Sequence, residues 1–142
     1  MDYSKLSKKE LIDLVKEKVQ ITGPASAYDY LKEMKIDYSQ ENFIIFALNG
    51  INEILAHKVL FKGGVDYCQV DAKIIFKYLL SQKNVSGFIT AHNHPSGKCT
   101  PSPEDLKIFK KLKSGGDILS LQLIDNLIFT EIKFYSAQEH IF

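Results

Sequence analysis

The feature that most constrains this chain is a mostly apolar run that ends in two histidines one residue apart. Residues 85–91 have the composition of a buried strand, and His92 and His94 come at its end. Because positions two apart on an extended chain point to the same side, both imidazoles should lie on one face. Pro95 and Gly97 then end the strand. The chain must therefore carry two imidazoles side by side where a buried strand reaches the surface.

A hydroxyl and a carboxylate follow these histidines after a short loop. Ser102 and Asp105 lie three residues apart, at the start of a segment with the pattern of a helix. Two neutral imidazoles and one carboxylate are a suitable ligand set for a divalent metal, with zinc as the first choice. Three protein ligands leave the fourth tetrahedral position to water, which is typical of catalytic rather than structural zinc sites. The pattern therefore indicates one Zn²⁺ per chain, bound by His92, His94 and Asp105.

The same stretch also has the residues of an ordinary helix start. Ser102 is a preferred N-cap residue, and Pro103 suits the first helical position. The acids Glu104 and Asp105 favour the positive end of the helix dipole. The two histidines could also be strand-end residues whose rings form hydrogen bonds with the backbone. The residues alone leave the metal site and the plain helix start open as alternatives.

Length and composition describe an ordinary globular protein. The chain has 142 residues, enough for one domain with a sizeable core, and is 45% hydrophobic and 25% charged. The net charge of +1 gives no reason to expect a nucleic acid or a membrane surface as a partner. No apolar run approaches the ~18 residues of a membrane span, and the polar N-terminus is unlike a signal peptide. Cys68 and Cys99 do not make a disulfide framework, so a cytoplasmic location is expected.

Hydrophobic periodicity and turn signals predict alternating helices and strands. Helices are expected at residues 7–20, in a short segment after Gly23-Pro24, at 70–80 and at 103–113. Strands are expected at residues 43–48, 51–61, 85–91, 118–124 and 127–134. We divide the chain into a helical N-terminal extension, residues 1–23, and one domain, residues 24–142.

Three dipeptides are expected to separate these elements. Asn49-Gly50 has the composition of a tight hairpin turn. Gly115-Gly116 should stop the last helix. Asp125-Asn126 should form a tight turn between the last two strands, which makes Asp125 a turn residue without a function of its own.

The motif around the histidines resembles the signature of a known family. His92-x-His94, seven residues, Ser102, two residues and Asp105 is similar, without a gap, to the signature of the JAMM (MPN+) metalloproteases. Within that family, residues 92–97 and 101–105 resemble the bacterial RadC branch. Two further segments add to the resemblance, Gln40-Glu41-Asn42-Phe43 and Leu123-Ile124-Asp125. The likeness to RadC covers about residues 24–135.

The resemblance implies a fold, a reaction and roles for named residues. The fold would be α+β and cytidine-deaminase-like, with a central mixed β-sheet flanked by helices. The reaction would be zinc-dependent hydrolysis of a peptide or isopeptide bond in an unidentified peptide or protein substrate. Glu41 would accept the proton of water, with Glu53 as the alternative base. Ser102 would donate a hydrogen bond to the developing oxyanion.

Two departures from the RadC pattern and two rival functions stay open. This chain has Asn126 where RadC relatives commonly have histidine, and residues 70–73 replace a segment rich in His, Pro and Arg. One rival function is a non-catalytic MPN scaffold module, although every position of the motif is present. The other is a DNA-repair-associated role, but the sequence has neither a basic stripe nor the clustered carboxylates of a two-metal site.

Cys99 lies in the loop between the expected ligands. It is either a small loop residue or a fourth ligand that would close the metal site. We expect no membrane and no nucleic acid in direct contact with the protein, and the sequence leaves its oligomeric state open.

Overall fold

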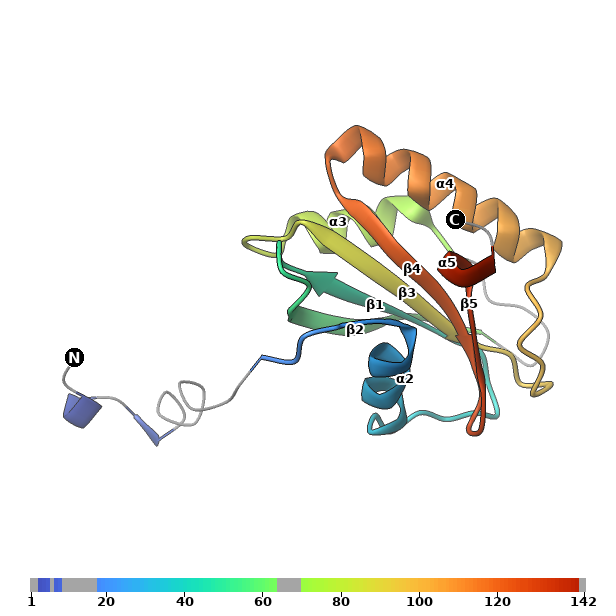
Figure 1. Ribbon diagram of the computed structural model, residues 1–142, viewed down its shortest axis with the longest axis horizontal. Coiled ribbons are helices and arrows are strands. Elements are labelled where there is room, and N and C mark those ends of the chain that lie inside the picture. The colour runs from blue at the N-terminus through green and yellow to red at the C-terminus, as the bar shows by residue number, and fades with distance from the viewer. Residues whose placement is uncertain (1–2, 6, 9–17, 64–69, 141–142) are drawn as a thin grey trace.

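The computed structural model describes residues 3–5, 7–8, 18–63 and 70–140, and its centre is a five-stranded sheet (Figure 1). The strands are β1 (Asn42–Leu48), β2 (Ile54–Lys62), β3 (Gly87–Asn93), β4 (Gln122–Phe129) and β5 (Phe134–Ser136). The helices are the 3-10 helix η1 (Tyr3–Lys5), α2 (Pro24–Lys32), α3 (Ala72–Leu80), α4 (Pro103–Leu119) and α5 (Ala137–His140). The strand order is β2-β1-β3-β4-β5, and only β3 and β4 run parallel. This architecture confirms the predicted α+β class with a mixed sheet flanked by helices.

Helices cover both faces of the sheet, with α3 and α4 above it and α2 below it in Figure 1. Every residue of β1 and of β3 is buried, which explains why β1 is an almost continuous apolar run and why the polar side chains of β3 need partners inside the protein. Helices α3 and α4 turn one side to the sheet, where Ile75, Leu79, Phe109 and Leu112 are buried, while Ile74 and Leu106 are 45% and 41% exposed.

The hairpin between β1 and β2 is present, but its turn is longer than the predicted Asn49-Gly50 pair. β2 begins at Ile54 rather than at residue 51. The side-chain oxygen of Asn49 accepts hydrogen bonds from the backbone N–H groups of Ile51 (3.1 Å) and Glu53 (2.9 Å). Asn52 takes the left-handed conformation with φ of 62°. Asn49 therefore organises a wider loop through its side chain.

The predicted helix at residues 7–20 falls mainly on residues 9–17, outside the described part of the chain. Its expected last turn is not helical. Gln20 forms an antiparallel bridge with Glu53, and the backbone N–H of Ile54 donates to the carbonyl of Val19 at 2.8 Å. Residues 19–21 thus run along the first part of β2, the edge strand of the sheet.

Gly115-Gly116 does not stop α4, which continues to Leu119. A Cβ atom at Gly116 would lie 2.4 Å from the carbonyl oxygen of Leu121 and 3.2 Å from the ring of Phe88. Such contacts are too short for any other residue without a shift of the backbone. Gly116 therefore permits close packing of α4 on the sheet, and the helix ends instead at Ser120 in the left-handed conformation, with φ of 57°.

The predicted turn at Asp125-Asn126 is also absent, because both residues lie inside the continuous strand β4. Asp125 is 3% exposed and Asn126 is fully buried. The chain turns later, at residues 130–133, where the N–H of Thr130 donates to the carbonyl of Lys133 at 2.8 Å. The predicted position of the turn was wrong because two polar residues lie within a strand. Their side chains are buried and form hydrogen bonds in the interior.

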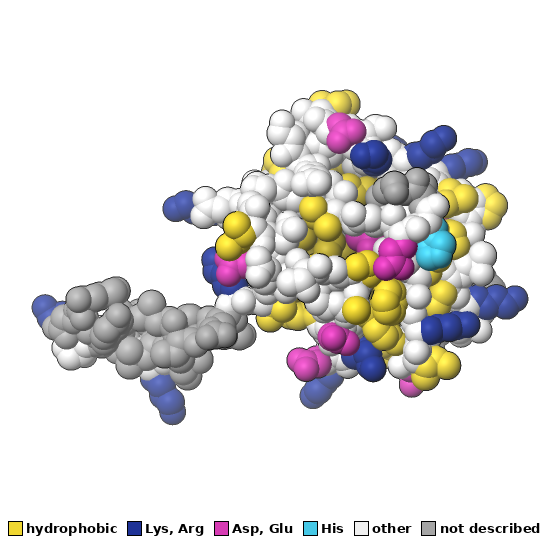
Figure 2. All heavy atoms as spheres, viewed as in Figure 1, with side chains coloured by type: hydrophobic (Ala, Val, Ile, Leu, Met, Phe, Trp, Pro, Cys, Tyr) yellow, Lys and Arg dark blue, Asp and Glu magenta, His cyan; other side chains and the backbone are white. Residues whose placement is uncertain are grey.

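The surface of the described residues gives no sign of a membrane span or of a basic stripe on the face shown. None of the helices in that part of the chain is both long and apolar enough to cross a bilayer. On the face seen in Figure 2, basic side chains lie mainly around the rim, several of them close together at the upper right, while hydrophobic side chains gather near the middle.

Candidate metal centre

Four side chains from three parts of the chain converge at one end of the sheet. Glu41 directly precedes β1, and Asp105 lies in the first turn of α4. His92 is the last residue but one of β3, and His94 directly follows the strand. One possible ligand atom from each of the four lies within 4.8 Å of all the others. The Nε2 atoms of the two histidines are 3.1 Å apart. The Asp105 oxygens lie 3.2 Å from Nε2 of His92 and 3.1 Å from Nε2 of His94.

The sheet topology explains how residues distant in sequence meet here. β1 and β3 are antiparallel neighbours, and Phe43 pairs with His92. The residues just before β1 therefore lie beside the end of β3, which places Glu41 next to the histidines. The other candidate base, Glu53, lies beyond the far end of β1, about 20 Å away at ~3.3 Å per residue. Its carboxylate accepts a hydrogen bond from the Asn49 side chain.

The two histidines occupy different environments. His92 is 1% exposed, and its ring stacks on Phe43 with centroids 5.8 Å apart and planes at 14°. His94 lies nearer the surface, and its Nδ1 is 3.1 Å from the carbonyl oxygen of Lys98. Because a carbonyl oxygen only accepts, this contact requires the hydrogen on Nδ1. The Asp105 carboxylate also only accepts, so the ring satisfies both contacts when it is protonated on Nδ1 and Nε2. With the hydrogen on Nδ1 alone, Nε2 carries the lone pair that could bind a metal ion.

Asp105 serves the helix start and the cluster at the same time. One of its oxygens accepts from the backbone N–H of Ser102 at 2.8 Å, and its own N–H donates to Ser102 Oγ at 3.1 Å, which completes a capping box. The two interpretations of this stretch are therefore compatible. The cap uses a lone pair of the Ser102 hydroxyl, so its hydrogen remains available to another acceptor.

The proximity of these groups shifts their pKa values in opposite directions. Burial alone would raise the pKa of the Asp105 carboxyl, but hydrogen bonds from the histidines and from Ser102 outweigh it and hold that pKa well below its usual range. The bond to Asp105 raises the pKa of His94. Burial raises the pKa of the Glu41 carboxyl, against the opposing effect of the nearby imidazoles. The cluster therefore pairs an ionised carboxylate with a second carboxyl that binds protons more readily than usual.

Cys99 and Asn126 stand outside the cluster of possible ligands. The sulfur of Cys99 lies 3.7 Å from the carbonyl oxygen of Lys133, in the turn before β5, so this side chain is directed away from the metal centre. Asn126 lies on β4 beside Thr90, whose hydroxyl donates to the Asn126 side-chain oxygen at 2.5 Å. The fourth-ligand alternative for Cys99 therefore has no support in this geometry.

Two buried amides at the metal centre were missed from the sequence. Asn42 and Asn93 are 2% and 0% exposed, and their side chains bond to each other and to the segment that carries Glu41. A signal was present, since a polar residue between two histidines at the end of a buried strand needs a partner. The identity of that partner depended on the pairing of β1 with β3.

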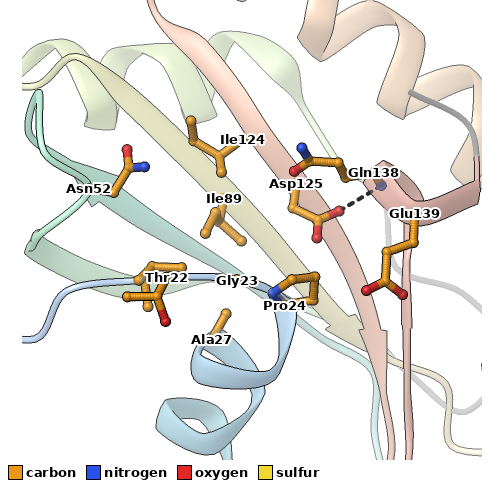
Figure 3. A pocket seen from close by; sticks show the side chains of 11 residues that line it. Thr22, Gly23, Pro24, Ala27, Asn52, Ile89, Ile124, Asp125, Gln138 and Glu139 are labelled. Carbon is orange, nitrogen blue, oxygen red and sulfur yellow. Dashed lines mark hydrogen bonds between the residues drawn. The ribbon is translucent and has the colours of Figure 1, made fainter.

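Asp125 is a buried structural residue on the opposite face of the sheet from His92. Its carboxylate accepts from the Ser136 hydroxyl (2.5 Å) and from the backbone N–H groups of Asn126 (2.7 Å) and Gln138 (3.0 Å). Figure 3 shows it beside a cavity of about 360 Å³, with the bond to Gln138 at the start of α5. Burial raises the pKa of this carboxyl, although the three hydrogen bonds lower it. Asp125 thus anchors α5 to β4.

We expect Asp125→Ala to lower the free energy of unfolding by about 2–3 kcal/mol, because it leaves buried donors without an acceptor. Urea unfolding of the metal-free protein measures this change. Any metal ion bound by the cluster should be retained, since Asp125 belongs to the other face. Asp29→Ala, an exposed acid on α2, is the matched control and should change stability by less than ~0.5 kcal/mol. Loss of that metal ion from Asp125→Ala under folding conditions would contradict this assignment.

The fold and the cluster together define a small α+β domain with side chains that could hold a metal ion at one end of its sheet. Residues 21–142 match the family described as the RadC-like JAB domain. The chain belongs to this family, which confirms the resemblance to RadC noted in the sequence.

Relatives with the name UPF0758 protein are similar over most of this chain. The one from Flavobacterium johnsoniae is 37% identical over 131 residues, which cover 92% of this chain and 56% of the relative. Those from Staphylococcus carnosus and Staphylococcus aureus are 34% and 35% identical over 122 residues, 86% of this chain and 54% and 53% of the relatives. The chain spans about half the length of the curated relatives it matches.

Proposed function

We propose that this domain is a JAMM-type zinc hydrolase that cleaves a peptide or isopeptide bond. The observation that carries the proposal is the convergence of Glu41, His92, His94 and Asp105 within 4.8 Å of one another. Metal centres and catalytic sites are built from partly buried acids and histidines that converge in this way. The side chains of His94 and Asp105 are 17% and 13% exposed, so the cluster is reachable from solvent.

The donor set fits zinc better than the hard cations. Magnesium and calcium prefer sites made entirely of oxygen ligands, whereas zinc takes imidazole nitrogen together with a carboxylate oxygen. Both histidines direct Nε2 toward the Asp105 carboxylate. His92, His94 and Asp105 would hold the ion, and the hydrogen bond from His94 Nδ1 to Lys98 would keep that ring oriented.

The chain's own residues would move the proton and stabilise the charge of the reaction. Zinc, when bound, supplies a Lewis acid that makes water a nucleophile near neutral pH. Glu41 would accept the proton of the attacking water and return it to the leaving amine. The free hydrogen of the Ser102 hydroxyl would be donated to the developing oxyanion, a contact worth about 3 kcal/mol in other hydrolases.

The proposed substrate is a peptide or a protein, attacked at an amide carbonyl. Peptides of defined sequence and isopeptide-linked peptides, incubated with the zinc-loaded protein, are the direct test. We expect products that gain the mass of one water at the broken bond, detected by mass spectrometry. Removal of zinc with a chelator should stop the reaction, and added zinc should restore it.

Two outcomes of this assay would contradict the proposal. Cleavage that persists at full rate after zinc removal would assign the activity to a different mechanism or to a contaminant. The absence of any cleavage across peptide, isopeptide and small-amide substrates would instead favour a scaffold role for the domain.

A further inference from the structure

Asn93, the residue between the two histidines, makes contacts on the opposite side of the strand from them. Alternation along β3 directs His92 to one face and Asn93 to the other, and His94, just after the strand, lies on the side of His92 with the two Nε2 atoms 3.1 Å apart. The Asn93 side-chain oxygen accepts from the backbone N–H of Asn42 at 2.8 Å and from its side-chain amide at 3.0 Å. The Asn93 side-chain N–H donates to the carbonyl of Gln40 at 2.9 Å.

These bonds hold the chain on both sides of Glu41. Gln40 and Asn42 are its immediate neighbours, and both are bound to Asn93. The Asn42 amide extends the network by donating to the carbonyls of Asp37 at 2.9 Å and Gln40 at 3.1 Å. The backbone of segment 37–42 is therefore bonded to the buried side-chain amides of Asn42 and Asn93. The Asn42 side chain is in turn held by Asn93.

Asn93 stands in for a missing main-chain partner at the end of the sheet. The ladder between β1 and β3 ends at the pair Phe43 and His92. Beyond it, the N–H of Asn42 would be buried without an acceptor, a costly situation that the Asn93 side chain prevents. A separate bond from the N–H of Gly63 to the carbonyl of Glu41, at 2.9 Å, ties the same segment to β2 but does not involve Asn93.

We propose that Asn93 is a positioning residue that holds Glu41 at a defined distance from the metal ligands. Residues 92–94 then carry two proposed metal ligands on one side of the chain. On the other side they carry Asn93, which fixes the segment of Glu41, the proposed proton acceptor. This proposal deepens the hydrolase function above and rests on it for the role of Glu41. Asn93 acts through Glu41, so its loss should disturb proton transfer while leaving the three ligands in place.

The first test is amide hydrogen exchange in the metal-free protein, which needs no substrate. In Asn93→Ala, the backbone N–H of Asn42 should exchange at least about tenfold faster, and peptides covering 37–42 should lose protection. Peptides from β3 and β4 should keep their protection. Asn126→Ala is the matched control, because it also removes a fully buried amide of the sheet but has no contact with segment 37–42. It should leave the exchange of that segment unchanged.

The second test is a double-mutant cycle on turnover of the zinc-loaded protein. Asn93→Ala should keep one zinc per chain, lower kcat about 10- to 100-fold and leave KM within about threefold. Glu41→Gln combined with Asn93→Ala should be no slower than Glu41→Gln alone, within a factor of about two. A residue with a general structural role would instead add its own loss to the double variant.

Each outcome decides the proposal. Unchanged exchange at 37–42, unchanged turnover, or multiplied losses in the double variant would each overturn it. If Asn93→Ala does not fold, Asn93→Asp replaces it, since it keeps the acceptor for Asn42 and puts a carboxylate oxygen, which cannot donate, against the Gln40 carbonyl. That variant should accelerate exchange at residues 37–40 and retain zinc, and failure to do so overturns the proposal. If the wild-type protein cleaves nothing, the hydrolase function fails, and exchange alone decides whether Asn93 holds the segment of Glu41.

Discussion

Replacement of His92 or Asp105 is expected to weaken zinc binding at least about a thousandfold, because each removes one of the three ligands that we propose for a single ion. His92→Ala removes an imidazole whose Nε2 faces Asp105 at 3.2 Å. Asp105→Asn is the more informative change at the helix. Its side-chain oxygen still caps the N–H of Ser102, but its negative charge is lost. Metal analysis after dialysis and competition with a chromogenic chelator measure the stoichiometry and the affinity.

Two controls separate zinc loss from general damage. Ser102→Ala removes the helix cap and should cost about 1 kcal/mol of stability, yet it should still hold one zinc per chain. His57→Ala removes a histidine of β2 whose Nδ1 bonds to the Tyr30 hydroxyl at 2.8 Å. His57 pairs with Phe46, so it lies further along β1 than the end that Glu41 precedes. Equal zinc in wild type, His92→Ala and Asp105→Asn would show that the ligand assignment is wrong.

Glu41→Gln should retain one zinc per chain and lose turnover by a factor of about 10² to 10⁴, because an amide cannot accept the proton of water. The measurement is kcat on whichever peptide or isopeptide substrate the wild-type protein cleaves, with zinc content determined on the same samples. Glutamine keeps the shape of the side chain, so the comparison isolates the ionisable group.

Glu53→Gln is the matched control for this experiment. Glu53 lies in the loop between β1 and β2, at the other end of the strand from Glu41. Its replacement should leave turnover within about twofold of wild type. Unchanged turnover in Glu41→Gln would remove Glu41 from the mechanism, and a large loss in Glu53→Gln would favour the alternative base.

Most elements of the fold could be predicted from local patterns, and the errors have a common origin. Two kinds of local signal predicted the observed elements correctly. They are the mainly apolar runs at β1 and at the start of β3, and the capping residues of α4. Gly115-Gly116 and Asp125-Asn126 carry equally clear local signals for a helix stop and a turn, and both predictions were wrong. In each case tertiary contacts decided the conformation, since Gly116 packs against the Leu121 carbonyl and Asp125 accepts bonds from α5 and its flanks.

The candidate site divides in the same way. The spacing of His92, His94, Ser102 and Asp105 could be interpreted as a site because these residues lie within one strand, loop and helix. Glu41 was found only through the family resemblance, since 51 residues separate it from His92 in the sequence. Asn93 and Asn42 were not found at all, because their bonds cross between two strands.

The sequence by itself determined which side chains are available and the local elements that carry them, because strand alternation and helix capping act over a few residues. Only the tertiary structure decided that Glu41, rather than Glu53, lies beside the histidines, and that Asn93 binds the segment next to it. The physical reason is the antiparallel register of β1 and β3, which pairs Phe43 with His92 and is set by burial of both faces of the sheet.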